Sequence, residues 1–316
     1  MVRALLHYRA SPALVQNLRN AAPPWLTTTS VDEADLARVL AEFARTDILL
    51  HVLAPVTAAL MDAAPRLKLI QKIGVGVNTI DLVAAKARGI KVANMPGTNS
   101  QAVSEMTLAL MLAALRKIVP FDHATRAGAG WSLPLDAVDA VSEIHGKTVG
   151  LIGYGAVPQR LAPVLKALGA RVVYCTRATD SGENADHLTL NELLALADIV
   201  SLHVPLTPDT HQLLGAAEFA RMKPGVVLIN TARGALVNEQ ALLQALQCGQ
   251  VRAAGLDVLA VEPAAAGNPL FDLPNVVVTP HLAWLTPETL ARSFSVAIEN
   301  CRRVRDGEPW LYEIPL

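Results

Sequence analysis

Short runs of apolar residues alternate along the chain with longer segments in which apolar positions recur every three or four residues. The short runs have the length of buried strands, and the longer segments have the spacing of helices that bury one face. Such alternation is typical of β–α–β units, whose strands form a parallel sheet. In the first hundred residues it predicts strands at 2–8, 46–52, 67–73 and 90–95 and helices at 11–20 and 31–44.

The pattern begins again after a helical segment at 99–117 and a less regular stretch at 131–143. The restart indicates a second parallel sheet, so we predict an α/β protein with two Rossmann-like or flavodoxin-like domains. Strands of the second series are expected within 146–155, 171–176, 198–204, 225–231, 251–258 and 275–280.

Two helices of the second half carry clear end signals. Asn238 is a plausible N-cap for a helix that ends before Gly249, because an asparagine oxygen accepts from the first turn and glycine adopts the left-handed end conformation. The segment 286–310 is predicted to be one amphipathic helix, closed by Gly307 and Pro309.

Composition narrows the class of protein. The 316 residues suffice for two domains of about 150 residues each. With 27 basic and 28 acidic residues and no basic stripe, nucleic acid and anionic membranes are not expected partners. The most apolar helical stretch, 106–115, is too short for the ~20 residues of a bilayer span. Three cysteines lie far apart without metal-type spacing, so we expect no metal site and a reducing, cytoplasmic setting.

Two glycine-rich turns follow predicted strands, and one of them has the context of a cofactor loop. Gly153 and Gly155 follow a strand, precede a helical segment, and are followed by a second strand that ends about 20 residues later. Glycines in that position let backbone N–H groups approach a pyrophosphate at a helix N-terminus. The other turn, with Gly74 and Gly76, lacks this context, and a simple tight turn is an equal alternative.

The cofactor loop departs from the usual G-x-G-x-x-G pattern because Pro158 occupies the third glycine position. Proline lacks an N–H and disfavours a helical conformation at Val157, so we expect the helix to begin at Pro158. Pro163 is expected to kink the same helix.

The acidic residue that reads a ribose in NAD-preferring sites is missing after the second strand. Thr176 and Arg177 stand there instead, and a hydroxyl with a guanidinium suits a 2′-phosphate. We therefore favour NADP(H) over NAD(H), with a solvated surface arginine as the alternative for Arg177.

The segment 203–281 carries the most specific motifs. It contains HVPLTPDTHQLLG, MKPGVVLINTARGALVNEQALLQAL, AAGLDVLAVEP and NPLFDLPNVVVTPHLAW. This series resembles the D-isomer-specific 2-hydroxyacid dehydrogenases. The likeness continues upstream through 74–113 and 146–155, and about the first 65 residues show little of it.

The resemblance implies a catalytic trio of Arg233, Glu262 and His281. A guanidinium can hold the carboxylate and ketone of a 2-oxo acid with forked donors. An imidazole can give a proton to the oxygen as hydride reaches the carbon, and an acid bonded to the far ring nitrogen orients it. Each residue alone has an ordinary structural alternative.

The resemblance also implies binding residues. Backbone N–H groups of Val75 and Gly76 would form a nest for the substrate carboxylate, together with Arg233 and His281. Asp257 would lie near the nicotinamide carboxamide, and Pro205 and Ala232 would line that pocket. The expected cofactor-binding residues are Gly153, Gly155, Ala156, Val157, Thr176, Arg177, His203, Pro205, Thr231, Ala232 and Asp257.

In the family arrangement, residues 1–98 and 285–316 would form the substrate domain and 99–284 the dinucleotide-binding Rossmann domain, with a cleft between them. Relatives are commonly homodimers through the cofactor domain, and we expect the same here.

The expected reaction is hydride transfer between NAD(P)H and a small 2-oxo acid, as in glyoxylate and hydroxypyruvate reductases. The loop 53–56, Leu-Ala-Pro-Val, suits a small or apolar substituent, whereas Lys72 would favour a phosphorylated one if it faced the cleft. Phosphoglycerate-type and phosphite-type dehydrogenases stay as alternatives, and Glu262 argues against the formate type. An NAD(H)-binding corepressor-like scaffold is the alternative outside the enzymes.

Overall fold

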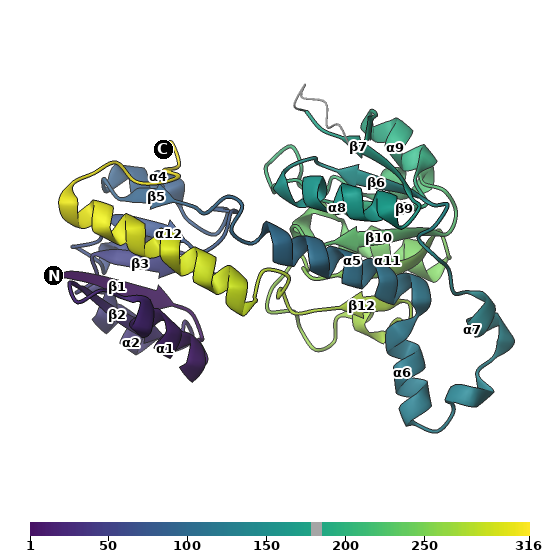
Figure 1. Ribbon diagram of the computed structural model, residues 1–316, viewed down its shortest axis with the longest axis horizontal. Helices are drawn as coiled ribbons and strands as arrows, with labels where there is room; N and C mark the ends of the chain where they lie inside the picture. The colour runs from purple at the N-terminus through teal and green to yellow at the C-terminus, as the bar shows by residue number, and fades with distance from the viewer. Residues whose placement is uncertain (178–184) are drawn as a thin grey trace. The chain divides into compact units, whose positions relative to one another are not determined.

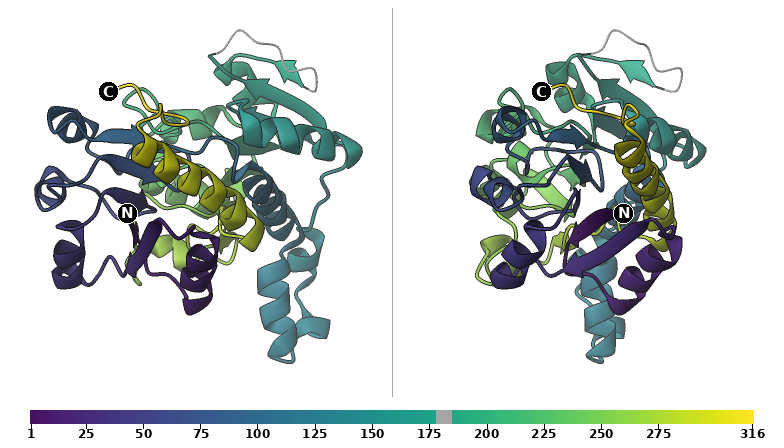
Figure 2. Two further views of the ribbon diagram at one scale, coloured as in Figure 1. Left: turned by 60° about the vertical axis from the view of Figure 1, so that its left-hand side comes forward. Right: turned by 90° about the vertical axis from the view of Figure 1, so that its left-hand side faces the viewer.

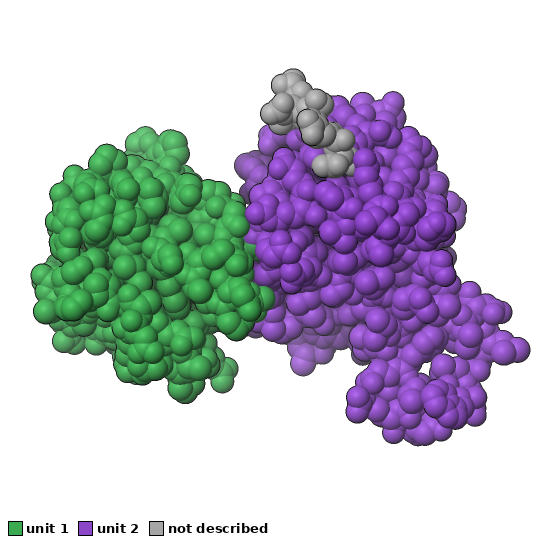
Figure 3. Space-filling model, in the orientation of Figure 1, with its two compact units in different colours: residues 1–99, 285–316 green, residues 100–284 purple. Residues whose placement is uncertain are grey.

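Two parallel β-sheets, each flanked by helices, make up the computed structural model, which describes residues 1–177 and 185–316 (Figure 1). They belong to two units: unit 1 comprises Met1–Asn99 and Leu285–Leu316, and unit 2 comprises Ser100–Trp284 (Figure 3). The predicted α/β class with two parallel sheets is confirmed.

Unit 1 contains a five-stranded sheet in the order β2-β1-β3-β4-β5, the flavodoxin-like arrangement. Its strands are short and mostly buried, as expected when helices cover both faces of a parallel sheet. The elements are β1 (Val2–His7), α1 (Pro12–Ala21), β2 (Leu26–Val31), α2 (Leu36–Phe43), β3 (Ile48–His51), α3 (Ala58–Asp62), β4 (Leu69–Lys72), α4 (Leu82–Ala87), β5 (Lys91–Ala93) and α12 (Pro287–Asp306).

Helices α2, α3 and α4 cover one face of this sheet, where Phe43, Met61 and Ala85 pack on strand residues in one core cluster. Helices α1 and α12 lie on the other face, and Figure 2 shows the long α12 beside α1. The last residues of the chain then pair with β5 at the edge of the sheet: Ile314 N–H donates to Val92 O at 2.8 Å.

The last residue of each of the neighbouring strands β1, β3 and β4 is basic. His7, His51 and Lys72 are register partners and all three are buried. Burial lowers the pKa of His51 well below its ordinary value, and the nearby Lys72 and His7 lower it further. His51 is therefore a neutral packing residue at pH 7, hydrogen-bonded to the Thr79 hydroxyl at 2.8 Å.

Unit 2 contains a seven-stranded sheet in the order β12-β11-β10-β9-β6-β7-β8. The order reverses between β6 and β9, which is the switch point where dinucleotides bind in Rossmann folds. The elements are α5 (Ser100–Arg116), α6 (Ile118–Arg126), η1 (Gly130–Ser132), α7 (Leu135–Asp139), β6 (Thr148–Ile152), α8 (Ala156–Ala167), β7 (Arg171–Cys175), β8 (Asp186–His187), α9 (Leu190–Leu196), β9 (Ile199–Leu202), α10 (Ala216–Arg221), β10 (Val226–Asn230), η2 (Gly234–Leu236), α11 (Glu239–Gln247), β11 (Val251–Leu256), η3 (Pro269–Asp272) and β12 (Val276–Val278).

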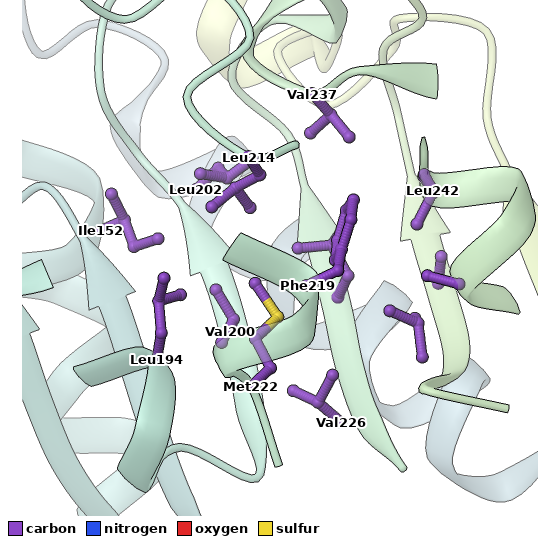
Figure 4. Packing of buried hydrophobic residues seen from close by; sticks show 14 of the residues in the cluster. Ile152, Leu194, Val200, Leu202, Leu214, Phe219, Met222, Val226, Val237 and Leu242 are labelled. Carbon is purple, nitrogen blue, oxygen red and sulfur yellow. The ribbon is translucent and has the colours of Figure 1, made fainter. Parts of the chain in front are cut away.

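Each face of this sheet has its own core. Helices α9, α10 and α11 pack on one face, where Phe219 and Met222 lie among strand residues such as Val200 (Figure 4). Helices α5 and α8 pack on the other face around Met111 and Leu161. Strands β6, β9 and β10 are therefore buried along their whole length, as expected when helices cover both faces of a parallel sheet.

The segment 117–140 of unit 2 differs from the rest of that unit. It contains α6, η1 and α7, and none of these three elements buries a residue. Figures 1 and 2 show α6 and α7 extending away from the sheet of unit 2. We call this segment the arm.

Three predicted helix-end residues are found at helix ends, and two strands of the structure were not predicted. Asn238 caps α11, Gly249 has a positive φ after it, and Gly307 closes α12 in the left-handed conformation. Strands β2 and β8 were not predicted. No helix in the described part of the chain is both long and apolar enough to span a bilayer.

Candidate active site

The loop after β6 provides a glycine turn at the N-terminus of α8. Gly153 has a φ of 96°, and a Cβ there would lie 2.6 Å from the carbonyl oxygen of His203, so the turn requires glycine. At Gly155 a Cβ would meet nothing within 4 Å, and no side chain caps the helix. The space at Gly155 and the uncapped N–H groups of Ala156 and Val157 fit a pyrophosphate.

Helix α8 begins two residues earlier than predicted. Ala156 is its first residue and Pro158, which is buried, its third, so the prediction that Pro158 begins the helix is wrong. The first four N–H groups of a helix have no intrahelical acceptor, and a proline at the third position therefore removes no helical bond. Pro163 lies inside the helix.

Thr176 and Arg177 lie just past the end of β7, at the strand edge where a ribose would be read. The Arg177 side chain is 76% exposed and forms a 3.4 Å ion pair with Asp209. An exposed pair of this length is weak, so the guanidinium can exchange Asp209 for another anion at small cost.

His203 follows β9 on the other side of the switch point. The main-chain N–H of His203 donates to Ile152 O at 2.7 Å, and the ring atom Nε2 is 2.9 Å from the Ser201 hydroxyl. Burial lowers the pKa of His203 to about 4, so the ring is neutral at pH 7. The neighbouring Pro205 is exposed, and its carbonyl accepts from the Thr210 hydroxyl at 2.7 Å.

A carboxylate–imidazole pair lies at the ends of β11 and β12. Glu262 Oε2 is 2.6 Å from His281 Nδ1, and Glu262 Oε1 accepts from the Leu259 N–H at 2.9 Å. Burial raises the pKa of Glu262, but the bond from His281, the Leu259 N–H and the charge of Arg233 outweigh it, and the net direction is down. With Nδ1 held by the carboxylate, Nε2 is the ring nitrogen left for a reacting oxygen.

Arg233 belongs to the same group of charges. Burial lowers the pKa of its guanidinium and the charge of Glu262 opposes that effect; an arginine stays protonated in any case. The Asn230 side chain fixes the loop before it, donating to Arg233 O at 2.9 Å and accepting from Ala232 N–H at 3.0 Å. A Cβ on Gly234 would lie 1.9 Å from the carbonyl carbon of Leu259, so glycine brings the two loops together.

The loop that carries His281 is held by Asp257. The buried carboxylate accepts from the Thr279 hydroxyl at 2.6 Å and from the N–H groups of Leu282 and Ala283, each at 2.9 Å. The main-chain carbonyl of Asp257 accepts from His281 N–H at 2.8 Å. Burial raises the pKa of Asp257 although these donors lower it. The Asp257 carboxylate thus holds the loop of His281, whereas the resemblance implies only that it lies near the nicotinamide carboxamide.

The predicted Thr231 and Ala232 lie in the turn between the end of β10 and Arg233. The Thr231 hydroxyl is 2.9 Å from that of Thr107 on α5. All the predicted residues of unit 2 therefore follow the carboxyl ends of strands in one parallel sheet, which meet at a single edge.

In unit 1 the predicted nest residues follow β4. Val75 is exposed, and the Val75 carbonyl accepts from the Asn94 side-chain amide at 3.0 Å. The Lys72 ammonium is buried and donates to the Val52 carbonyl, next to the loop 53–56. The Val52 carbonyl thus takes one of the three donors of this ammonium.

Sequence reasoning missed the residues that hold the loops in place. Asn230, Asn94 and Thr279 all act through bonds to neighbouring turns. Asparagine is a recognised turn residue, so Asn230, the last residue of β10, and Asn94, the first residue after β5, could have been found. Within the described residues, no group of histidine, cysteine or acidic side chains could hold a metal ion.

Comparison with known families matches residues 108–283 to the D-isomer specific 2-hydroxyacid dehydrogenase, NAD binding domain. Among curated proteins, the chain is 41% identical over 283 residues to the D-3-phosphoglycerate dehydrogenase of Mycobacterium leprae, covering 88% of this chain and 53% of that protein. The chain thus spans about half the length of that relative. It is 39% identical to the glyoxylate reductase of Aeropyrum pernix, covering 79% of this chain and 76% of that one.

A similar solved structure is that of an acyclic imino acid reductase in complex with NADPH and D-Arg. It is 30% identical to this chain, has a TM-score of 0.86, and covers 99% of this chain and 100% of its own.

The glycine at 155 gives a direct test of the cofactor loop. Gly155→Ala should leave the free energy of unfolding within about 0.5 kcal/mol of the wild type, because the new methyl meets no atom. The same methyl should weaken NADPH or NADH binding by about tenfold or more, because it occupies the approach to the pyrophosphate. Fluorescence titration of the reduced cofactor measures this, with Gly267→Ala, another uncrowded glycine, as the control. Equal affinities of all three proteins would contradict the assignment.

Proposed function

Because this chain belongs to the D-isomer specific 2-hydroxyacid dehydrogenase family, we propose that it transfers a hydride between a nicotinamide cofactor and C2 of a small 2-oxo acid. The observation that carries the proposal is the 2.6 Å bond between Glu262 and His281, with the charge of Arg233 acting on the same carboxylate. An imidazole whose Nδ1 is held by a carboxylate can donate a proton from Nε2, which is what protonation of a ketone oxygen requires.

The nicotinamide, when bound, supplies the hydride. Gly153, Gly155 and the first turn of α8 would hold its pyrophosphate. His281 gives the proton from Nε2 to the oxygen that becomes the hydroxyl, and takes it back when a hydroxy acid is oxidised. Glu262 stabilises the protonated ring and keeps it in one orientation.

Arg233 would bind the ketone oxygen and the carboxylate of the substrate with its forked donors, which polarises the carbonyl. In unit 1, the N–H groups of Val75 and Gly76 would donate to a substrate carboxylate.

Two substrate classes have support, and we favour the smaller one. The glyoxylate reductase relative and the short apolar loop 53–56 favour a small 2-oxo acid, and the Lys72 ammonium already donates to the Val52 carbonyl next to that loop. The identity to a D-3-phosphoglycerate dehydrogenase makes 3-phosphohydroxypyruvate the second candidate. Initial rates on glyoxylate, hydroxypyruvate and 3-phosphohydroxypyruvate distinguish them.

Replacing the proton donor tests the chemistry. His281→Ala should lower kcat by about a hundredfold or more, because no neighbouring group replaces the imidazole. Cofactor affinity should stay near the wild-type value, since the phosphate loop after β6 is unchanged. Absorbance at the reduced-nicotinamide band and a cofactor titration measure the two quantities. Near-normal turnover in this variant would contradict the proposed role of His281.

We favour NADP(H) as the cofactor. The support is the hydroxyl and guanidinium of Thr176 and Arg177 where an acid would select NAD, and the similar imino acid reductase is described with NADPH. Arg177→Ala should therefore reduce kcat/KM for NADPH by about tenfold and change that for NADH little. Arg171→Ala, which removes another exposed arginine of β7 and its ion pair with Asp186, is the matched control. A wild type that uses NADH equally well or better would overturn the preference.

A homodimer through unit 2 is the proposed assembly. The arm buries none of its own helical residues, yet it exposes Trp131 at 94% and Leu135 at 80%. Apolar side chains on a projecting segment without a core of its own are typical of interfaces. A second copy of the chain presents the same arm, as a two-fold dimer requires.

Trp131→Glu should therefore convert the dimer to a monomer, because a charge at a covered apolar site is costly. Sedimentation velocity measures the mass of the species. Val83→Glu, which changes an 81% exposed residue on α4 of unit 1, should leave the dimer intact. A wild-type monomer, or a Trp131→Glu dimer of unchanged stability, would contradict the proposal.

A further inference from the structure

Two successive carbonyl groups of the loop after β4 are held from the same side. The Gly74 carbonyl accepts from the Met95 N–H at 2.8 Å. The Val75 carbonyl accepts from the Asn94 side-chain amide at 3.0 Å. Both donors come from the two residues that follow β5, so one short segment fixes two consecutive peptide groups.

Each of these carbonyls shares a rigid peptide group with the next N–H. In a planar trans peptide, C=O and N–H point in opposite directions, and the cis bond recorded among the described residues is Glu262–Pro263. Holding the Gly74 carbonyl therefore directs the Val75 N–H away from β5. Holding the Val75 carbonyl does the same for the Gly76 N–H, so both proposed nest donors are aimed by Met95 and Asn94.

The two anchors are not equivalent. Met95 donates through its main chain, which every residue except proline can do. Asn94 donates through its side chain, so the direction of the Gly76 N–H depends on the residue type at position 94. A donor on the Val75 carbonyl also polarises that peptide and makes its N–H a stronger donor.

Asn94 is itself fixed by the end of the chain. Its N–H donates to Tyr312 O at 3.2 Å, and its carbonyl accepts from the Gln71 amide at 3.2 Å. The buried Asn300 on α12 donates to Leu311 O at 3.1 Å and accepts from the Leu311 N–H at 2.8 Å, which secures the terminal segment. Because its backbone is held in this way, the Asn94 side chain reaches Val75 from a fixed origin.

We propose that Asn94 is a positioning residue for the substrate carboxylate: it orients the Val75–Gly76 peptide so that the Gly76 N–H points at the anion. This inference rests on the proposed reduction of a 2-oxo acid. A neutral amide suits the task, because a carboxylate at position 94 would supply no N–H and would repel an anionic substrate.

The test compares Asn94→Ala and Asn94→Asp with the wild type. Asp has nearly the shape of Asn but, when ionised, only accepts hydrogen bonds. Both variants should raise KM for glyoxylate or hydroxypyruvate by about tenfold, the effect of losing a directed bond to a charged group. Asn94→Asp should raise this KM at least as much as Asn94→Ala, because it adds a negative charge. KM for the cofactor should stay within about twofold, since the Asn94 side chain bonds to Val75 and not to the glycine turn after β6.

A merely structural role gives a different result. Partial unfolding lowers the active fraction and hence kcat, but leaves KM unchanged. Asn20→Ala, which removes an exposed amide bonded to Gln16 on α1, should change neither constant. Wild-type KM values in the Ala or the Asp variant would overturn the role of Asn94 while the proposed function stands. A wild type inactive on every 2-oxo acid would overturn both.

Discussion

The buried carboxylate of Asp257 is the interaction on which the site of unit 2 depends. The three donors it accepts, together with the bond from His281 N–H to its main chain, tie the ends of β11 and β12 together. His281 has a φ of 55°, an unusual conformation for a non-glycine residue, and these bonds hold the loop in which it occurs. Only with that loop in place can Glu262 reach Nδ1. A buried acid thus sets the geometry of a partly exposed one.

The same constraint operates in both units: a parallel sheet collects the carboxyl ends of its strands at one edge, and neighbouring loops there must hold one another. In unit 2 the crowded glycines 153 and 234 let loops approach within contact distance. In unit 1 the end of β5 holds two carbonyls of the loop after β4. Chemistry-bearing groups are therefore directed mostly by backbone bonds, and the apolar cores keep the strands in register.

Most of the fold could be predicted from the sequence because its strands are continuous apolar runs and its helices carry caps such as Asn238. Strand β2 was missed because Leu26–Val31 is rich in threonine and only its ends are buried. The start of α8 was placed two residues too late. Proline disfavours a helical conformation at the residue before it, but Val157 is helical here, and the first helical turn needs no N–H from Pro158. Arg233, Glu262 and His281 were recognisable from ordered motifs. The supporting bonds of Asp257 and Asn94 were not, because they join loops whose proximity only the folded chain defines.

An isotope label follows the proposed hydride from the cofactor to the product. The chain is incubated with hydroxypyruvate and NADPH deuterated at C4 of the nicotinamide, on the face that is transferred, and the product is analysed by mass spectrometry and chiral chromatography. The wild type should form a D-2-hydroxy acid with one deuterium at C2, and the His281→Ala variant should not. Unlabelled product, the L-isomer, or labelled product formed equally by the variant would contradict it.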